Sequence, residues 1–265
     1  MGEIILSIVF GAVQGLTEFL PISSSGHLII FHHLFKAPLL DSLAFDAFLH
    51  LGTLVALIFY FRKDLQKFIL AFSKKSLDYK PERKNVFLIL IAFLPAATVG
   101  FFLADKIEIF FRSIEFVSLA FIAGGLAIFI FDNYFKKNRE ISSLSWADSL
   151  LIGLAQILAF IPGVSRSAIT IIAGLGLNLK RDEAARFSFL LAIPITFFAG
   201  LKSFYDLIKL DSGFNATLLL GGFLSSAVFG YLCIKYFLKF LKNNSLKIFA
   251  FYRLAIGILL FLLLR

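Results

Sequence analysis

Six apolar stretches, each long enough to cross a lipid bilayer as an α-helix, dominate this 265-residue chain. They lie near residues 43–61, 86–104, 116–135, 184–205, 216–239 and 247–264. A helix needs about 20 mostly apolar residues to span the hydrocarbon core. Hydrophobic residues make up 59% of the chain and charged residues only 16%, which is too apolar for a soluble domain of this size. The sequence therefore predicts an all-α polytopic membrane protein.

Two short polar breaks interrupt the apolar chain at corresponding places. The first is Pro21–His27 (PISSSGH), and the second is Pro162–Ser167 (PGVSRS). When the breaks are aligned on their prolines, Ser24 corresponds to Ser165. The backbone groups that such a loop frees inside lipid need polar partners, so we expect both halves to build one buried polar site. A helical arm with a Gly and a Gln precedes each break: Gly11 and Gln14, then Gly153 and Gln156.

The segments around the breaks are predicted to form re-entrant helix–loop–helix pairs. Segments 4–20 and 27–36 flank the first break, and segments 147–160 and 166–177 flank the second. In the alternative interpretation, segment 4–20 simply crosses the membrane. A second internal match, of residues 93–100 with 223–230, indicates a duplicated chain: a single membrane domain with repeat 1 at about 1–140 and repeat 2 at about 141–265. Each half then has one re-entrant pair and three transmembrane helices, and because three is odd the repeat has inverted topology.

The basic residues predict which side each loop occupies. With the 62–85 loop in the cytoplasm, most loop Lys and Arg residues fall on the cytoplasmic side, as the positive-inside rule expects. The outer face then keeps only Lys36, Lys106, Arg112, Lys209 and Arg265. Both termini are predicted outside, with the first break entering from the outer face and the second from the cytoplasm. Because these loops account for the formal net charge of +9, no nucleic-acid partner is expected.

Glu18 and Arg166 are the two charges that most need explanation. Each costs about 2.5–3.5 kcal/mol at the centre of a membrane helix, and a structural ion pair is the simplest alternative to a functional role. Gln14 lies one turn before Glu18 on the same helix face. Helices that start after the breaks direct unsatisfied backbone N–H groups into the loops, which makes an anion site, and Ser24 or Ser165 fits the capping position. The Arg166 fork suits phosphate oxygens, so a metal-bridged diphosphate would satisfy both charges.

The four histidines of the chain lie in the first break or within the 25 residues that follow it. His27 lies three residues after Ser24, close enough to act as its base or acid. Asp46 and His50, one turn apart, are a candidate local pair that contacts substrate or metal. Three further residues receive no catalytic role: His32 and His33 are unassigned, and Arg253 is expected to be a snorkelling or pairing residue.

At these residues the chain resembles the undecaprenyl-pyrophosphate phosphatase family, the bacitracin-resistance type of integral membrane enzyme. The first family motif is an acid or Gln, three residues, Glu, and then Leu-Pro-x-Ser-Ser-x-Gly-His. Residues 14–27 (QGLTEFLPISSSGH) match it. The second motif, Pro-Gly-x-Ser-Arg-Ser-Gly, is matched by residues 162–167, with Ala168 where the family usually has Gly. Gln14 is within the family pattern but removes one possible carboxylate ligand.

The resemblance implies hydrolysis of undecaprenyl diphosphate to undecaprenyl phosphate and inorganic phosphate, with a divalent cation, Mg²⁺ or alternatively Ca²⁺. This reaction recycles the lipid carrier for cell-wall synthesis at the bacterial inner membrane. The resemblance also implies a homodimer. Ser24 is the implied nucleophile, His27 its proton partner, Glu18 the essential acid and, with Gln14, the metal ligand, and Arg166 the diphosphate clamp. The implied diphosphate-binding residues are Ser23, Ser25, Gly26, Ser165, Ser167 and Arg166.

Two functions and two mechanisms stay open at this point. An ion-coupled transporter would share the inverted repeat and a polar site near the midplane. A second superfamily of lipid phosphatases also uses Ser-Gly-His and Ser-Arg elements, but it needs an upstream Lys…Arg-Pro motif and a later His that this sequence lacks. For hydrolysis, Ser24 either attacks phosphorus to give a phosphoserine or only binds phosphate while His27 or Glu18 activates water.

Overall fold

The computed structural model describes residues 2–35, 43–73, 79–209 and 216–263, which fold almost entirely into helices. Their order is α1 (Gly2–Phe19), α2 (Ser24–Phe35), α3 (Leu43–Tyr60), α4 (Arg62–Ser73), α5 (Lys80–Phe111), α6 (Ile114–Tyr134), η2 (Ile141–Ser143), α7 (Trp146–Gln156), η3 (Ile157–Phe160), α8 (Arg166–Gly176), α9 (Arg181–Lys209), α10 (Ala216–Leu241) and α11 (Lys247–Leu263). η2 and η3 are short 3₁₀ segments. The predicted all-α class is therefore confirmed for the described residues.

Five helices of the described chain are long and apolar enough to cross a membrane: Gly2–Phe19, Lys80–Ala104, Ile114–Tyr134, Arg181–Leu201 and Ala216–Leu241. Four of them cover stretches predicted from the sequence. The stretches at 43–61 and 247–264 are helical as α3 and α11 but are not among these five. α1 is among them, so length and composition alone would allow it to cross.

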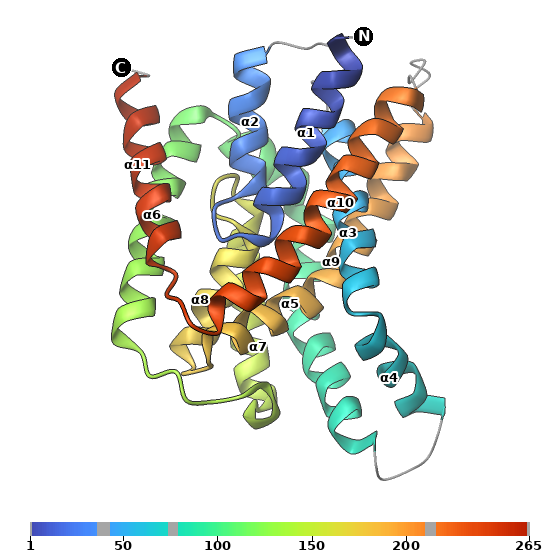
Figure 1. The fold of residues 1–265 in the computed structure, drawn as a ribbon, viewed down its shortest axis with the longest axis vertical. Helices are drawn as coiled ribbons and strands as arrows, with labels where there is room; N and C mark the ends of the chain where they lie inside the picture. Colours follow the sequence, from blue (N-terminus) through green and yellow to red (C-terminus); the bar gives the residue numbers. More distant parts are fainter. Residues whose placement is uncertain (1, 36–42, 74–78, 210–215, 264–265) are drawn as a thin grey trace.

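The two polar breaks lie at the closed ends of two helical hairpins. α1 runs from the end of the molecule that also holds the end of α11 to its middle, where the chain reverses and α2 returns (Figure 1). The α7–α8 hairpin approaches from the opposite end (Figure 1). The loops touch at the middle of the molecule, where the Ser167 hydroxyl donates to the Leu20 carbonyl at 2.9 Å and the Gly163 N–H donates to the Ser25 hydroxyl at 3.5 Å.

Glycines let the first arm of each hairpin approach a long helix very closely. A Cβ on Gly11 of α1 would lie 2.2 Å from the Gly222 carbonyl oxygen of α10, and a Cβ on Gly153 of α7 would lie 2.4 Å from the Ala92 carbonyl oxygen of α5. Small residues at such contacts allow backbones to pack side by side in a membrane. The predicted Gly–Gln arms therefore use their glycines as helix-packing positions.

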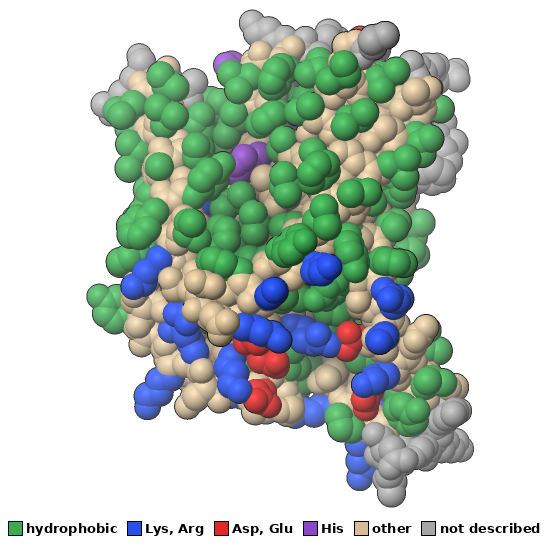
Figure 2. Space-filling model, viewed as in Figure 1, with side chains coloured by type: hydrophobic (Ala, Val, Ile, Leu, Met, Phe, Trp, Pro, Cys, Tyr) green, Lys and Arg blue, Asp and Glu red, His purple; other side chains and the backbone are tan. Residues whose placement is uncertain are grey.

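Charged side chains gather at one end of the molecule. Figure 2 shows the Lys and Arg side chains of this face at the end opposite the start of α1, with a largely hydrophobic surface above them. Ion pairs stabilise this end: Arg139–Asp148 at 2.7 Å and Arg181–Asp132 at 2.5 Å. Four residues used to predict the orientation lie outside the described residues, as does the side chain of Lys209: Lys36, Lys74, Lys75 and Arg265.

Candidate active site

Both serine loops end in the same local geometry. Ser23 and Ser165 have φ values of 74° and 76°, in the left-handed region that is unusual for a residue with a side chain. Each hydroxyl then caps the helix that follows: Ser23 accepts from the Gly26 N–H at 3.3 Å, and Ser165 accepts from the Ala168 N–H at 3.2 Å. The N-termini of α2 and α8 are therefore both turned toward the junction of the loops, where their free N–H groups favour an anion.

This geometry corrects the proline-based alignment of the two breaks by one residue. Ser23, not Ser24, corresponds to Ser165, so Ser24 corresponds to Arg166 as the first residue of its helix. The expectation that Ser24 caps its helix was wrong, whereas Ser165 does cap α8. Alignment on the prolines misleads because the capping serine is the left-handed residue itself, and the second loop has one more residue between its proline and that serine.

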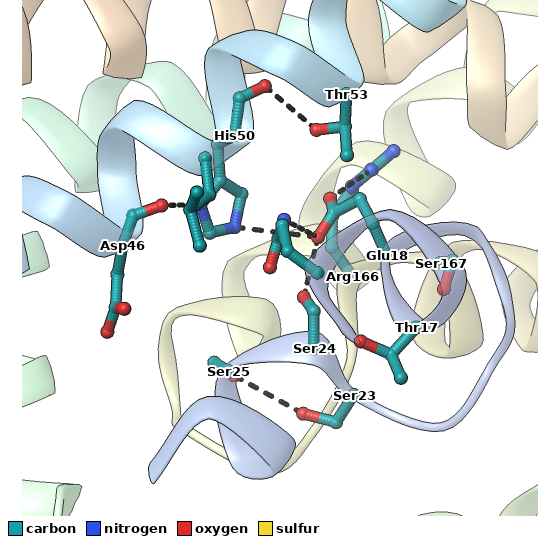
Figure 3. A network of polar contacts seen from close by, with 12 residues as sticks. Thr17, Glu18, Ser23, Ser24, Ser25, Asp46, His50, Thr53, Arg166 and Ser167 are labelled. Carbon is teal, nitrogen blue, oxygen red and sulfur yellow. Dashed lines mark hydrogen bonds and ion pairs between the residues drawn. The ribbon is translucent and has the colours of Figure 1, made fainter. Parts of the chain in front are cut away.

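Glu18 is the centre of the polar network (Figure 3). Its Oε1 accepts from Arg166 Nη2 at 2.8 Å, and its Oε2 accepts from the Ser24 hydroxyl at 2.5 Å. The same Oε2 accepts from Gln14 Nε2 at 3.0 Å and lies 3.4 Å from His50 Nε2. The predicted grouping of Glu18, Ser24 and Arg166 is thus present in three dimensions, although 148 residues separate Glu18 from Arg166 in the sequence.

A cavity of about 120 Å³ opens beside this network. It is lined by Glu18, Ser23, Ser24, Ser25, His50, Ala159, Ser165 and Arg166. The lining combines one carboxylate, one guanidinium, an imidazole and four hydroxyls, which is a set suited to a phosphate group with its reacting partners. Among the predicted diphosphate-binding residues, Ser23, Ser25, Ser165 and Arg166 line the cavity.

Gly26 and Ser167, also predicted to bind the diphosphate, do not line the cavity. A Cβ on Gly26 would lie 2.3 Å from a ring carbon of Phe121, so this glycine allows α2 to pack closely on α6. Ser167 is buried, and its hydroxyl ties α8 to the first loop through the Leu20 carbonyl. The structure therefore gives both residues a packing or bridging position rather than direct access to the cavity.

The structure does not bring His27 to Ser24. His27 Nδ1 lies 2.6 Å from the Ser23 carbonyl oxygen, and Nε2 lies 2.7 Å from the Tyr252 hydroxyl. The ring is also stacked on Tyr252, with ring centroids 5.7 Å apart. A spacing of three residues suggested contact with Ser24, but the side chain points from α2 toward α11, and it instead supports the backbone of the left-handed Ser23.

His50 is the histidine that reaches the network, and the sequence had given it only a secondary place. Its Nδ1 lies 2.8 Å from the Asp46 backbone carbonyl oxygen, which directs Nε2 toward Glu18 (Figure 3). The Asp46 carboxylate does not pair with His50 but lies 2.8 Å from His32 Nε2. The one-turn spacing of Asp46 and His50 was the only signal for this contact, and it pointed to the wrong atom of Asp46.

Gln14 and Glu18 offer oxygen atoms of the kind that a divalent cation binds, although the described residues hold no cluster of three or more His, Cys, Asp or Glu side chains suited to a metal. Gln14 Oε1 is buried and has no hydrogen-bond partner among the described residues, while the amide nitrogen of the same side chain donates to Glu18. Carboxylate, amide and hydroxyl oxygens are the ligands that Mg²⁺ and Ca²⁺ prefer. Gln14 and Glu18 therefore remain suitable ligands, one turn apart on α1.

Arg253, expected to be a snorkelling or pairing residue, does not snorkel but pairs, and its partners are backbone carbonyl groups. It is completely buried in α11, and its guanidinium donates to backbone carbonyls of both serine loops. Only the tertiary structure shows this, because the partners are main-chain atoms that no sequence motif marks.

Comparison with known proteins identifies the family of this chain. The model of the family "Bacitracin resistance protein BacA" matches residues 7–259. Proteins named undecaprenyl-diphosphatase from Methanosphaera stadtmanae and Rubrobacter xylanophilus are 40% and 41% identical to this chain, over 99% and 98% of it and 99% and 97% of their own lengths. A third, from Thermomicrobium roseum, is 42% identical over 96% of this chain and 95% of its own length. The chain therefore belongs to the bacitracin resistance protein BacA family.

Proposed function

We propose that this protein is a membrane-embedded phosphatase that hydrolyses undecaprenyl diphosphate to undecaprenyl phosphate and inorganic phosphate. The observation that carries the proposal is the contact of Glu18 with both Ser24 and Arg166 at the meeting point of two helix N-termini. A nucleophile, a carboxylate that can take its proton and a cation for phosphate oxygens are then within reach of one another. The names of the full-length relatives specify the substrate class. Recycling of this lipid carrier links the protein to cell-wall synthesis and bacitracin resistance.

In the proposed mechanism, Ser24 attacks the terminal phosphorus of the diphosphate. Its proton passes to the Glu18 carboxylate, to which the hydroxyl already donates at 2.5 Å. The bond from phosphorus to the bridging oxygen breaks, and undecaprenyl phosphate leaves with that oxygen. Water then attacks the phosphoserine, Glu18 returns its proton to the departing serine oxygen, and inorganic phosphate leaves with both protons of the water. Glu18 replaces His27 as the proton acceptor because His27 faces Tyr252 instead.

Arg166 and the two helix N-termini stabilise the charge of the transferring phosphoryl group. Arg166 is held from two sides, by Glu18 through Nη2 and by the Ser188 carbonyl through Nη1 at 3.3 Å. A fixed planar fork of this kind matches two phosphate oxygens. Positive groups aimed at the developing charge are usually the largest contribution to phosphoryl transfer.

The mechanism includes a divalent cation, Mg²⁺ or alternatively Ca²⁺. Glu18 and Gln14 Oε1 would hold it, and it would supply neutralisation of the diphosphate charge. His50 Nε2, 3.4 Å from Glu18 Oε2, would help to orient the carboxylate.

We also propose an inverted repeat of two re-entrant hairpins, each followed by three crossings, in a single domain with halves at about 1–140 and 141–265. The matching left-handed caps of Ser23 and Ser165 support it, as do the matching close approaches of Gly11 and Gly153 to α10 and α5. The basic end of the molecule supports an orientation with both termini outside (Figure 2). The inner membrane of a bacterial cell as location, and a homodimer, remain predictions from the resemblance.

The experiment that tests the function is phosphate release from undecaprenyl diphosphate by the purified protein in liposomes, with ion flux measured in the same vesicles. Phosphate release that depends on Glu18 and occurs without a gradient supports the phosphatase. Substrate-dependent ion flux without phosphate release would instead support the transporter.

A further inference from the structure

Arg253 of α11 binds both serine loops through their backbone carbonyl groups. Its Nη2 donates to the Gly163 carbonyl at 2.8 Å, and its Nη1 donates to the Val164 carbonyl at 3.2 Å and to the Pro21 carbonyl at 3.3 Å. Gly163 and Val164 directly precede the capping Ser165, and Pro21 lies two residues before the capping Ser23. One side chain thus fixes both loops just ahead of the helix N-termini that line the site.

The same guanidinium also binds α6, so the loops are held against a rigid helix pair. Nη2 donates to the Ala120 carbonyl at 2.8 Å, and Nε donates to the Phe121 carbonyl at 3.3 Å. Gly124 of α6 leaves the space for it, because a Cβ there would lie 2.1 Å from Nη2. The five donors of an arginine suit this arrangement, whereas the three donors of a lysine leave carbonyls without a partner.

The charge of Arg253 has no acidic partner in the described part of the chain, and its guanidinium carbon lies 5.2 Å from the centre of the Phe121 ring. A buried charge without a counter-ion is costly, and a charge inside a membrane is more so. The carbonyl oxygens solvate the guanidinium. Its positive charge still lies next to the two serine loops, where it favours the negative charge of the proposed diphosphate.

We propose that Arg253 is a positioning residue for phosphoryl transfer: it fixes the two serine loops against each other so that Ser24 and Arg166 converge on one phosphate group. The inference rests on the proposed function. It differs from a purely structural role because Arg253 binds not only α6 but also the two loop segments directly ahead of the capping serines. Its loss is therefore expected to slow turnover more than it weakens binding of the lipid tail.

The test compares the steady-state kinetics of wild type and Arg253→Lys on undecaprenyl diphosphate in detergent. We expect kcat to fall at least about tenfold in the variant, as for a lost group that aligns a transition state. KM should change little, because Arg253 does not itself line the cavity. Arg181→Lys is the matched control: Arg181 pairs with Asp132 at the basic end, away from the cavity, and this variant should keep the wild-type kcat.

Gly124→Ala provides a second variant that leaves Arg253 in place but pushes on its guanidinium. It should lower kcat in the same direction, while Gly221→Ala should not, because a Cβ on Gly221 meets its nearest neighbour at an ordinary 3.4 Å. Both are glycine substitutions inside apolar helices, so they separate displacement of Arg253 from a general effect of the methyl group.

Three outcomes would overturn the inference. Arg253→Lys with wild-type kcat and only a lower melting temperature would make Arg253 structural, and so would loss of monodisperse protein in both Arg253→Lys and Gly124→Ala. A rise in KM at unchanged kcat would assign Arg253 to binding instead. A wild-type protein that releases no phosphate contradicts the proposed function itself, which is a separate and distinguishable failure.

Discussion

At the residue scale, the proposed mechanism depends on the Ser24 hydroxyl, whose oxygen is the nucleophile. Its hydrogen bond to Glu18 places a proton acceptor where a nucleophilic serine needs one. Ser24→Ala should therefore abolish phosphate release, and phosphate should be trapped on Ser24 in the wild type. The measurement is phosphate release together with mass spectrometry of the acid-quenched enzyme. A Ser24→Ala enzyme that still works at about a tenth of the normal rate would leave direct attack by water as the mechanism.

Arg166 gives a second prediction at this scale. Arg166→Lys keeps the positive charge but loses the planar fork that holds Glu18 and would hold two phosphate oxygens. We expect its kcat/KM to fall nearly as far as that of Arg166→Ala. Near-normal turnover of the Lys variant would reduce Arg166 to a counter-charge for Glu18.

The sequence predicted some residues of this site well and the contacts of others poorly. Glu18, Ser24 and Arg166 stood out because charged and hydroxyl groups are expensive in apolar segments, and the structure brings all three together. The orientation of His27 and the contact of His50 depend on how α2 and α3 are rotated against their neighbours, which no local pattern determines.

At the scale of elements, the hairpin arms depend on glycine at their closest contacts. Gly11→Ala would force its methyl group onto the Gly222 carbonyl oxygen, because the two atoms would be 2.2 Å apart. Overpacking of this kind costs about 1–3 kcal/mol. We expect a lower melting temperature for Gly11→Ala in detergent, and an unchanged one for Gly221→Ala. Equal melting temperatures for both variants would show that α1 and α10 can separate without cost.

The helices themselves were largely predictable, and their relation to one another was less so. Long apolar runs located α5, α6, α9 and α10, because burial in lipid selects apolar residues along the whole helix. The one-residue difference between the serine loops escaped prediction because a left-handed backbone at Ser23 or Ser165 leaves no mark in composition.

At the scale of the whole molecule, the concentration of basic residues at one end predicts the orientation in the membrane (Figure 2). A cysteine in place of Lys80, at the start of α5, should be shielded from an impermeant thiol reagent in intact cells. A cysteine in place of Phe110, at the other end of the same helix, should react. The native Cys233 is buried and contributes little background. Labelling of position 80 from outside would reverse the proposed topology.

The one-residue correction between the loops has a consequence for how the site could have arisen. At the first position of the helix after each capping serine, one loop carries Ser24 and the other carries Arg166. Two identical loops would offer either two hydroxyls or two guanidinium groups, so a nucleophile opposite a guanidinium requires that the loops differ at this position. Division of labour between the halves had to come with sequence divergence at this one position, so an ancestral dimer of identical halves could have bound a phosphate long before it could cleave one.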